Sequence, residues 1–529
     1  MNLRPSKALS VAAALAFLVA AGCTDPTVAP KSTVTGANIW ADQGSYASYM
    51  AKLYGGLILT GQQGPAGNAD ISGIDEGFSE YLRLYWYMQE VPSDEAVIGW
   101  GDPGLPALNN HTWDATNSMV VAMYYRVYFQ VVLANEFLRQ TTLDQLNARG
   151  VGATLKTTIQ QYRAEARFLR ALAYAHGMDL FGPIPLTTEA NTIGSIPAQV
   201  SRDSIYNYVV SELTAIRDSL PPAAGNYGRA TAAAANMLLA EVYLNAGVYT
   251  GTTHYDLALN AAAAAIAGGY TLAPVFRNNF TSDNNLSPEL IFAAVQDGTH
   301  TQTWGGMTFL VHAGCGGGDN DADPRKMFAA DYGMDYCWGG YRLKQQSNRL
   351  FDPADGRASF FFRTGHTDSV ITIGDYYSGI AAPKFTNKTS TGGPGSQLGM
   401  IDTDFPIFRL AEAYLIYAEA NVRGGGGAAG TALGYMNALR QRAYGNATHN
   451  FAAVPPLDTI LAERGRELLF EAKRRTDLIR FGKFSGGTYL WAWKGNAPGG
   501  VSIAARFDLY PLPANELSAN PTLVQNPGY

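Results

Sequence analysis

Stretches of apolar and small side chains with helical spacing recur along the chain, and this recurrence limits the fold more strongly than any other feature. They cover residues 117–140, 155–180, 203–220, 230–245, 255–267, 405–423, 431–444 and 457–480. In the second stretch, Ala164, Phe168, Ala171 and Ala175 fall on one stripe, as expected of a helix with one buried face. Because small residues let neighbouring helices approach closely, the sequence predicts a mainly α fold of repeated antiparallel helix pairs.

Successive helix pairs of this kind are typical of a tetratricopeptide-like scaffold. The tetratricopeptide consensus itself is weak in this chain, so the prediction rests on helix spacing. Two long regions without a helical pattern, residues 61–111 and 270–400, interrupt the series. Both contain many Trp and Tyr residues, which argues against disorder, and long ordered loops are usually functional. We therefore expect the ligand site in these loop-rich regions.

The composition excludes several function classes. The chain has 529 residues and a formal net charge of -6, which argues against a phosphate-backbone partner such as nucleic acid. Beyond the N-terminal segment, no apolar run approaches the roughly 18 residues that a membrane-spanning helix needs. A lipid is therefore the only membrane anchor that the sequence predicts.

The N-terminus has the pattern of a bacterial lipoprotein. Arg4 and Lys7 precede an apolar stretch that is too short to span a bilayer as a stable helix. Small residues then lead to Cys23, as a lipoprotein signal peptidase requires. This predicts a signal peptide at residues 1–22, a lipidated Cys23 and a flexible tether at residues 23–38. The alternative is an ordinary signal peptide whose cleavage site lies near a cysteine.

With Cys23 lipidated, Cys315 and Cys337 are the two cysteines that remain. Both lie in one Gly-rich stretch, and an extracytoplasmic compartment is oxidising. The sequence therefore leaves two possibilities open, a disulfide between them or two free buried thiols.

Three alternating carboxylates, Asp319, Asp321 and Asp323, resemble the start of a calcium-binding loop. The run lacks the glycine and the distal glutamate of an EF-hand. Calcium is therefore a possible cofactor, and a solvated acidic loop is the alternative that the sequence favours.

No catalytic motif is present. The chain contains no G-x-S-x-G elbow, H-E-x-x-H helix or phosphate-binding loop. Glu463, Glu467, Glu471 and Arg474 have helical spacing, which favours a set of ion pairs over acid–base chemistry. We therefore predict that the protein is not an enzyme and requires no cofactor. Hydrolysis would need two carboxylates that face a glycosidic bond, and a glycoside hydrolase with such a pair is the alternative.

Several segments together match one family in their order and spacing. They are AEARFLRA (164–171) with LFGPIP (180–185), FRLAEAY (408–414), DLIRFG (477–482), YPLP (510–513) and QNPGY (525–529). From Cys23 to Tyr529 the chain resembles the SusD/RagB family of outer-membrane nutrient-binding lipoproteins. This resemblance implies a single SusD-like domain at residues 39–529, with four tetratricopeptide-like helix pairs beside a loop-rich ligand-binding region.

Segments of the first loop-rich region make the resemblance to the family more specific. LTGQQG (59–64), GIDEG (73–77) and EVPSDEA (90–96) look like the corresponding segments of the family's starch-binding founding member. In the family, an arc of three aromatic rings follows the curve of a helical α-1,4-glucan. By position, the resemblance implies that Trp100, Trp304 and Trp338 form this arc. It also implies that Arg83 is a sugar contact, and that Asp102 stands near the place of the starch binder's amide side chain.

These residue types suit a sugar. A pyranose ring has an apolar face of C–H groups, and an exposed indole offers it a flat, rigid surface at low entropic cost. For each tryptophan taken alone, core packing is the alternative. Ion pairing within the protein is the alternative for Arg83.

The resemblance also implies a location and partners. The expected protein is a lipid-anchored, surface-exposed outer-membrane lipoprotein that binds starch-like α-glucan and passes it to a SusC-like TonB-dependent transporter. The alternatives are a SusD-like binder of another glycan or of peptides, a glycoside hydrolase, and a scaffold that uses its helical repeats for protein contacts.

Overall fold

The computed structural model describes residues 39–61, 64–318 and 322–529. The predicted signal peptide, Cys23 and the tether lie outside these residues, as do Asp319 and Asp321. The chain divides into two units, Met1–Ser48 and Tyr49–Tyr529. The described part of the first unit contains a short 3-10 helix, Ile39–Ala41, and the start of α2 (Ser45–Gly55).

The second unit is mainly helical, as the sequence predicts. Its longer helices are α3 (Tyr81–Glu90), α5 (Ser118–Gln140), α7 (Ala153–Phe181), α8 (Arg202–Ile216), α9 (Ala232–Leu244), α11 (Tyr255–Ile266), α12 (Gly306–Ala313), α14 (Leu410–Val422), α15 (Ala429–Tyr444) and α16 (Leu457–Glu467). Shorter helices are α4 (Leu105–Asn110), α6 (Leu143–Ala148), α10 (Ala246–Thr250), α13 (Gln345–Asn348), α17 (Arg474–Arg480) and α18 (Ala514–Ala519).

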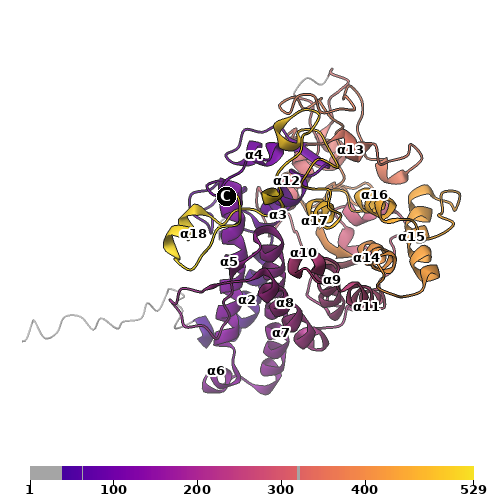
Figure 1. The fold of residues 1–529 in the computed structure, drawn as a ribbon. Coiled ribbons are helices and arrows are strands. Elements are labelled where there is room, and N and C mark those ends of the chain that lie inside the picture. The colour runs from indigo at the N-terminus through magenta and orange to yellow at the C-terminus, as the bar shows by residue number, and fades with distance from the viewer. Residues whose placement is uncertain (1–38, 62–63, 319–321) are drawn as a thin grey trace, which may run out of the picture. The chain divides into compact units, whose positions relative to one another are not determined.

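Seven of these helices pack on one another in chain order. The contacts run from α5 to α7, α8, α9, α11, α14 and α15, and Figure 1 shows the series passing from purple to orange. Small side chains make the close approach possible: Ala258, Ala262 and Ala265 of α11 are fully buried, and α11 lies between α9 and α14. Whether the helix pairs are tetratricopeptide-like repeats stays a prediction.

Side-chain caps define where several predicted helices begin. The Asn117 side chain accepts hydrogen bonds from the backbone N–H groups of Met119 and Val120, at the start of α5. Thr231 accepts from Ala234 at the start of α9. Such caps replace hydrogen bonds that the first helical turn lacks, and they explain why the predicted and observed helix starts agree closely.

Two of the predicted helices differ from those observed. Residues 405–423 begin with a strand, β6 (Phe405–Arg409), which pairs with β4 (Leu290–Ala294) before α14 starts. Residues 457–480 are divided into α16 and α17, because Phe470 and Ala472 adopt left-handed backbone conformations between them. At the break, the Phe470 carbonyl accepts a hydrogen bond from Trp86 Nε1 at 3.0 Å, so a tertiary contact overrides the helical pattern.

Conversely, each region expected to lack helices contains a buried one. In α3 every residue except Tyr85 is buried, and in α12 every residue is buried. Both helices are short, at ten and eight residues. In α3 the polar residues Arg83, Gln89 and Glu90 are buried along with the apolar ones, so the usual contrast between a buried apolar face and an exposed polar face does not apply.

Within the part of the chain that the structure describes, the strands form three antiparallel pairs. They are β1 (Ala96–Ile98) with β5 (Tyr341–Leu343), β2 (Ile184–Pro185) with β3 (Gln199–Val200), and β4 with β6. The β1–β5 pair joins the two loop-rich regions and positions the candidate site.

The acidic run of α16 faces the interior and forms what we call the buried ion cluster. Its members are Glu289, Arg357, Arg409, Arg442, Glu463, Glu467 and Glu471. Glu467 is fully buried and accepts from Arg409 Nη1 at 2.7 Å, from Arg357 Nη1 at 2.9 Å and from Arg442. The predicted ion pairs are therefore present. One of them, Arg466 with Glu463, lies within α16, but most of the partners come from other segments.

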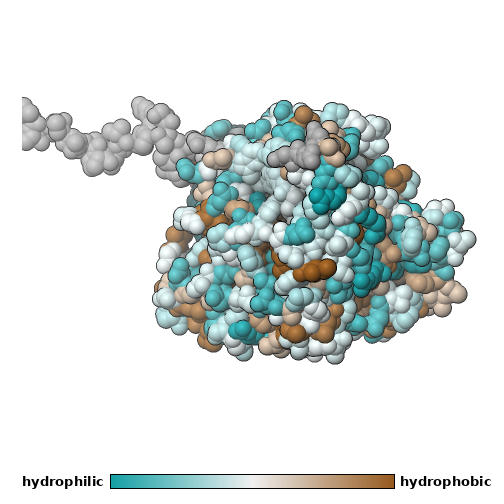
Figure 2. Space-filling view, turned by 90° about the horizontal axis from the view of Figure 1, so that it is seen from above, coloured by the Kyte–Doolittle hydropathy of each residue, from teal (hydrophilic) through white to brown (hydrophobic). Residues whose placement is uncertain are grey.

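Figure 2 shows the molecule from above, with apolar residues scattered among polar ones over the visible face. Among the residues that the structure describes, no helix combines the length and apolar character needed to cross a membrane.

Candidate functional site

The β1–β5 pair brings Trp100 and Trp338 together. Ala96 lies opposite Leu343 and Ile98 lies opposite Tyr341. Trp100 follows β1 by two residues and Trp338 precedes β5 by three, so the same register, continued, places the two tryptophans almost opposite each other. Their ring centroids lie 6.3 Å apart, with an interplanar angle of 52°.

Trp304 lies next to the same ring. It comes just before α12, and its ring centroid lies 6.2 Å from that of Trp338, at an angle of 54°. Trp338 is therefore the middle member of a row formed by three segments that are distant in sequence, and all three side chains are half-buried. We call Trp100, Trp338 and Trp304 the tryptophan row. The structure thus brings together the three aromatic residues that the resemblance implies.

The end of α12 holds the segment that carries the middle ring. The backbone N–H groups of Trp338, Gly339 and Gly340 donate to the carbonyls of His312, Cys315 and Ala313, at 2.9, 2.7 and 3.0 Å.

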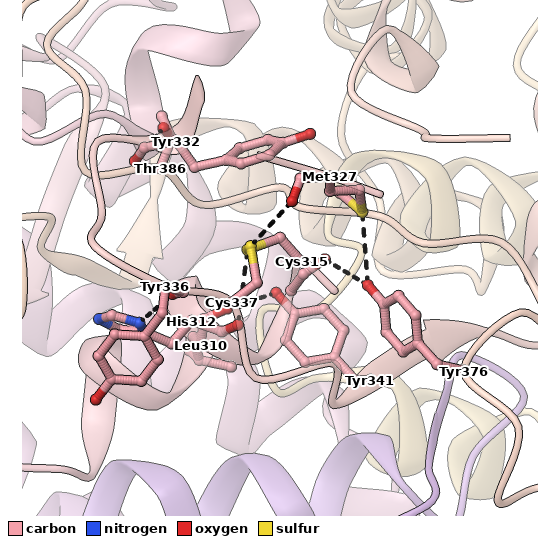
Figure 3. Close-up of a disulfide and its surroundings, with 11 residues drawn as sticks. Leu310, His312, Cys315, Met327, Tyr332, Tyr336, Cys337, Tyr341, Tyr376 and Thr386 are labelled. Atoms are coloured by element: carbon pink, nitrogen blue, oxygen red, sulfur yellow. Dashed lines mark hydrogen bonds between the residues drawn. A yellow bond between two sulfur atoms is a disulfide. The ribbon is translucent and has the colours of Figure 1, made fainter. Parts of the chain in front are cut away.

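A disulfide joins Cys315 to Cys337 (Figure 3), and Trp338 is the next residue in the chain. Of the two possibilities that the sequence left open, the structure therefore contains the disulfide. Backbone hydrogen bonds and a covalent link together restrict the middle of the tryptophan row.

Two further aromatic side chains lie against the row. His312 stacks on Trp338 at a centroid distance of 4.8 Å and an angle of 20°. Burial lowers the pKa of His312, so its ring is neutral at pH 7, and Nδ1 lies 2.8 Å from the Tyr336 carbonyl. The Tyr336 ring lies 6.3 Å from that of Trp338 and is 44% exposed. Tyr336 could have been proposed as a site residue from the sequence, because it stands two residues before Trp338. Nothing in the sequence marks His312 in this way.

Arg83 is buried below the row rather than displayed on it, with 4% of its surface exposed. Its Nη1 donates to the carbonyl of Trp304 at 3.0 Å and to that of Gly77 at 3.3 Å, and its Nε donates to Tyr87 Oη at 2.9 Å. The guanidinium also lies 6.0 Å from the Trp100 ring centroid. Arg83 therefore supports both ends of the tryptophan row.

Asp102 is half-buried near Arg83. The pKa of Asp102 is raised overall. Burial is the main cause and the charge of Asp75 adds to it, whereas the charge of Arg83 opposes the shift. Sequence reasoning missed Asp75, which is exposed and accepts a hydrogen bond from the Gly77 N–H at 2.9 Å. Asp75 also lines a hollow of about 450 Å³ beside Trp304, a size within the usual range for small-molecule sites of about 300–1,000 Å³.

The predicted calcium loop is only partly described. Asp323 pairs with Arg325, whose Nη2 lies 2.7 Å from Oδ2, and hydrogen bonding to this arginine lowers the pKa of Asp323 to about 2. Within residues 39–61, 64–318 and 322–529, no group of three or more His, Cys, Asp or Glu residues is arranged to hold a metal ion. Because Asp319 and Asp321 lie outside these ranges, calcium binding stays a prediction.

Comparisons with known proteins agree with the fold. The chain is 33% identical to the starch-binding protein SusD of Bacteroides thetaiotaomicron, over 98% of both chains. It is 26% identical to SusD-like protein P2 of Formosa agariphila, over 80% of this chain and 83% of that protein.

Among solved structures, surface glycan-binding protein A from Bacteroides fluxus superimposes with a TM-score of 0.69 at 23% identity. The match covers 92% of this chain and all of that one.

Two family descriptions match separate parts of the chain. The description "SusD family" matches residues 318–529, and "Starch-binding associating with outer membrane" matches residues 93–244. The first match includes Trp338 and the second includes Trp100. Together with the identity to SusD along nearly the whole chain, they show that this protein belongs to the SusD/RagB family.

Proposed function

We propose that the protein binds starch-like α-1,4-glucans by stacking their sugar rings on the tryptophan row. The observation that carries the proposal is the row itself, which is made of three half-buried indoles from distant segments. The ring centroids of neighbouring indoles lie 6.3 and 6.2 Å apart. The identity to a starch-binding protein along nearly the whole chain supports the choice of ligand. Neither matching family description names a catalytic activity, and we propose a binding protein, not an enzyme.

The shape of the row favours a curved ligand. Each indole is tilted by just over 50° from its neighbour, so a straight, flat chain cannot lie against all three faces. By analogy with base stacking, each sugar contact contributes roughly 1–3 kcal/mol. Arg83 acts mainly by fixing the backbone of Trp304, whereas Asp102 and Asp75 accept hydrogen bonds from sugar hydroxyls.

The proposal extends to location and partner. A lipid on Cys23 anchors the protein in the outer membrane, exposed at the cell surface, and residues 23–38 serve as the tether. The glycan then passes to a SusC-like TonB-dependent transporter. Support comes from the N-terminal sequence pattern and from the family description that names association with the outer membrane.

Affinity electrophoresis tests the ligand. Native gels that contain amylose, dextran, inulin or laminarin separate α-1,4-glucan binding from binding of other glycans. We expect amylose to retard the wild-type protein, and Trp100→Ala to migrate close to its position in a gel without glycan, because one of three stacking surfaces is lost.

The other outcomes distinguish the alternatives. Retardation by laminarin or another glycan but not by amylose assigns a different ligand, and release of reducing sugar from amylose indicates a hydrolase. No retardation by any of the four glycans contradicts sugar binding.

The disulfide offers a second test. Changing both Cys315 and Cys337 to Ser frees the segment that presents Trp338, so binding must order this segment at an entropic cost. We expect maltoheptaose affinity, measured by isothermal titration calorimetry, to fall several-fold while the far-ultraviolet circular dichroism spectrum stays the same. Wild-type affinity in the double variant would show that the backbone hydrogen bonds to α12 are sufficient.

A further inference from the structure

Gly340 occupies the narrow space between α12 and the Trp100 ring. A Cβ atom at this position would lie 2.7 Å from Cβ of Ala313, 2.8 Å from Cζ2 of Trp100 and 3.0 Å from Cη2 of the same ring. Separations below 3.0 Å are too short for carbon atoms in van der Waals contact, whose optimum is about 3.5–4.0 Å. The indole therefore takes its observed position only because residue 340 has no side chain.

The backbone at Gly340 cannot easily move to make room. Its N–H donates to the Ala313 carbonyl at 3.0 Å, and Tyr341, the next residue, already pairs with Ile98 in the β1–β5 ladder. On the other side, the disulfide at Cys337 and the hydrogen bond from Trp338 to His312 hold the segment to the end of α12. Trp100 is the freer neighbour, since its side chain is half-buried and lies at the end of β1.

We infer that Gly340 determines the tilt of Trp100 within the tryptophan row and thereby selects glycans of one curvature. This inference rests on the proposed function and adds the residue that determines its specificity. Of the three indoles, Trp100 is the one whose ring atoms, Cζ2 and Cη2, lie where a Cβ at position 340 would stand, so Trp100 is the ring whose angle responds to the residue beneath it. A methyl group at position 340 would turn Trp100 away from Gly340 and change the curve along which three sugar rings stack.

Two ligands of different stiffness test this role. β-Cyclodextrin is a closed α-1,4-glucan ring with fixed curvature, whereas maltotriose is short and flexible. In Gly340→Ala we expect the affinity for β-cyclodextrin to fall about tenfold or more, because a displaced ring loses a stacking contact. Maltotriose adapts to the new angle, so its affinity should change less than about threefold. General damage to the fold would weaken both ligands equally.

Gly101→Ala is the matched control. It adds the same methyl group one residue from Trp100, at a glycine without a positive φ and with no atom within 4 Å of the added Cβ. Its affinities for both ligands should equal those of the wild type.

A double variant separates the clash with Ala313 of α12 from the clash with Trp100. Ala313→Gly combined with Gly340→Ala removes the short contact between the two Cβ atoms and keeps the contact with Trp100. It should therefore keep the fold and still lose β-cyclodextrin affinity selectively. If this folded double variant lost affinity equally for both ligands, or lost none, the inference would be overturned. The proposed function would still stand, provided that the wild type binds the ligands. A wild-type protein that binds neither ligand would overturn both.

Discussion

Replacing Trp338 with Ala is expected to lower the affinity for maltoheptaose roughly tenfold to a hundredfold, because it removes the stacking surface at the centre of the row. Trp338 is the only one of the three tryptophans that contacts both others, at 6.3 and 6.2 Å. Its loss divides the row into two separated rings, which cannot hold one curved ligand together. Isothermal titration calorimetry of the wild type and the variant measures the effect.

Phe328→Ala provides the control for this prediction. Phe328 is 45% exposed and lies in the same loop-rich region, but it forms no ring contact with the tryptophan row. Its removal should leave the affinity for maltoheptaose unchanged. If Trp338→Ala bound maltoheptaose as tightly as the wild type and Phe328→Ala, the row would not be the binding surface.

The largest expected effect on stability comes from the buried ion cluster. Glu467→Gln keeps the size of the side chain but removes a charge that faces Arg357, Arg409 and Arg442. Breaking a buried charge pair in this way typically costs about 3–5 kcal/mol. We expect a clearly lower midpoint in thermal and urea unfolding. Glu136→Gln is the control, because Glu136 is partly exposed and its ion pair with Arg139 and its hydrogen bond from Gln140 lie on the surface of one helix; such exposed pairs contribute about 0–1 kcal/mol.

The same cluster predicts acid sensitivity. Burial raises the pKa of Glu463, but the charges of Arg357 and Arg466 outweigh it and lower the pKa to about 2. The pKa of Glu467 is lowered too, against its burial, by Arg442, Arg409 and Arg357. A carboxyl whose folded-state pKa is lowered stabilises the protein fully above its unfolded-state pKa, near 4.5, and this contribution is lost as the pH falls towards 2. Equal unfolding midpoints for Glu467→Gln and the wild type at pH 7 would contradict the stabilising role of the buried ion cluster.

Much of the helical scaffold could be predicted from the sequence because its helices are amphipathic or rich in alanine and begin at recognisable caps. Asn117 and Thr231 are examples, since both precede a helical pattern and both form the expected cap. The helix α3 could not be predicted, because it is short and its polar residues Arg83, Gln89 and Glu90 are buried against partners that are distant in sequence. The break at Phe470 escaped prediction for another reason, since it depends on a contact with Trp86, far away in sequence.

The candidate site, like the fold, could be predicted from the sequence only in part. Family resemblance located Trp100, Trp304 and Trp338, but their proximity depends on the β1–β5 register and on the end of α12, which are long-range contacts. Arg83 was expected at the ligand, and the structure places it beneath the row, where its Nη1 donates to the carbonyls of Gly77 and Trp304. Contact between Arg83 and a sugar stays a prediction. His312 and Gly340 carried no local signal, since their importance comes from what packs against them.

The most direct test of the central claim is a crystal structure of the protein grown with maltoheptaose. The account predicts one oligosaccharide whose sugar rings lie on Trp100, Trp338 and Trp304, with Asp75 or Asp102 within hydrogen-bond distance of its hydroxyls. An ordered maltoheptaose bound elsewhere, with the three indoles free of sugar, would contradict it.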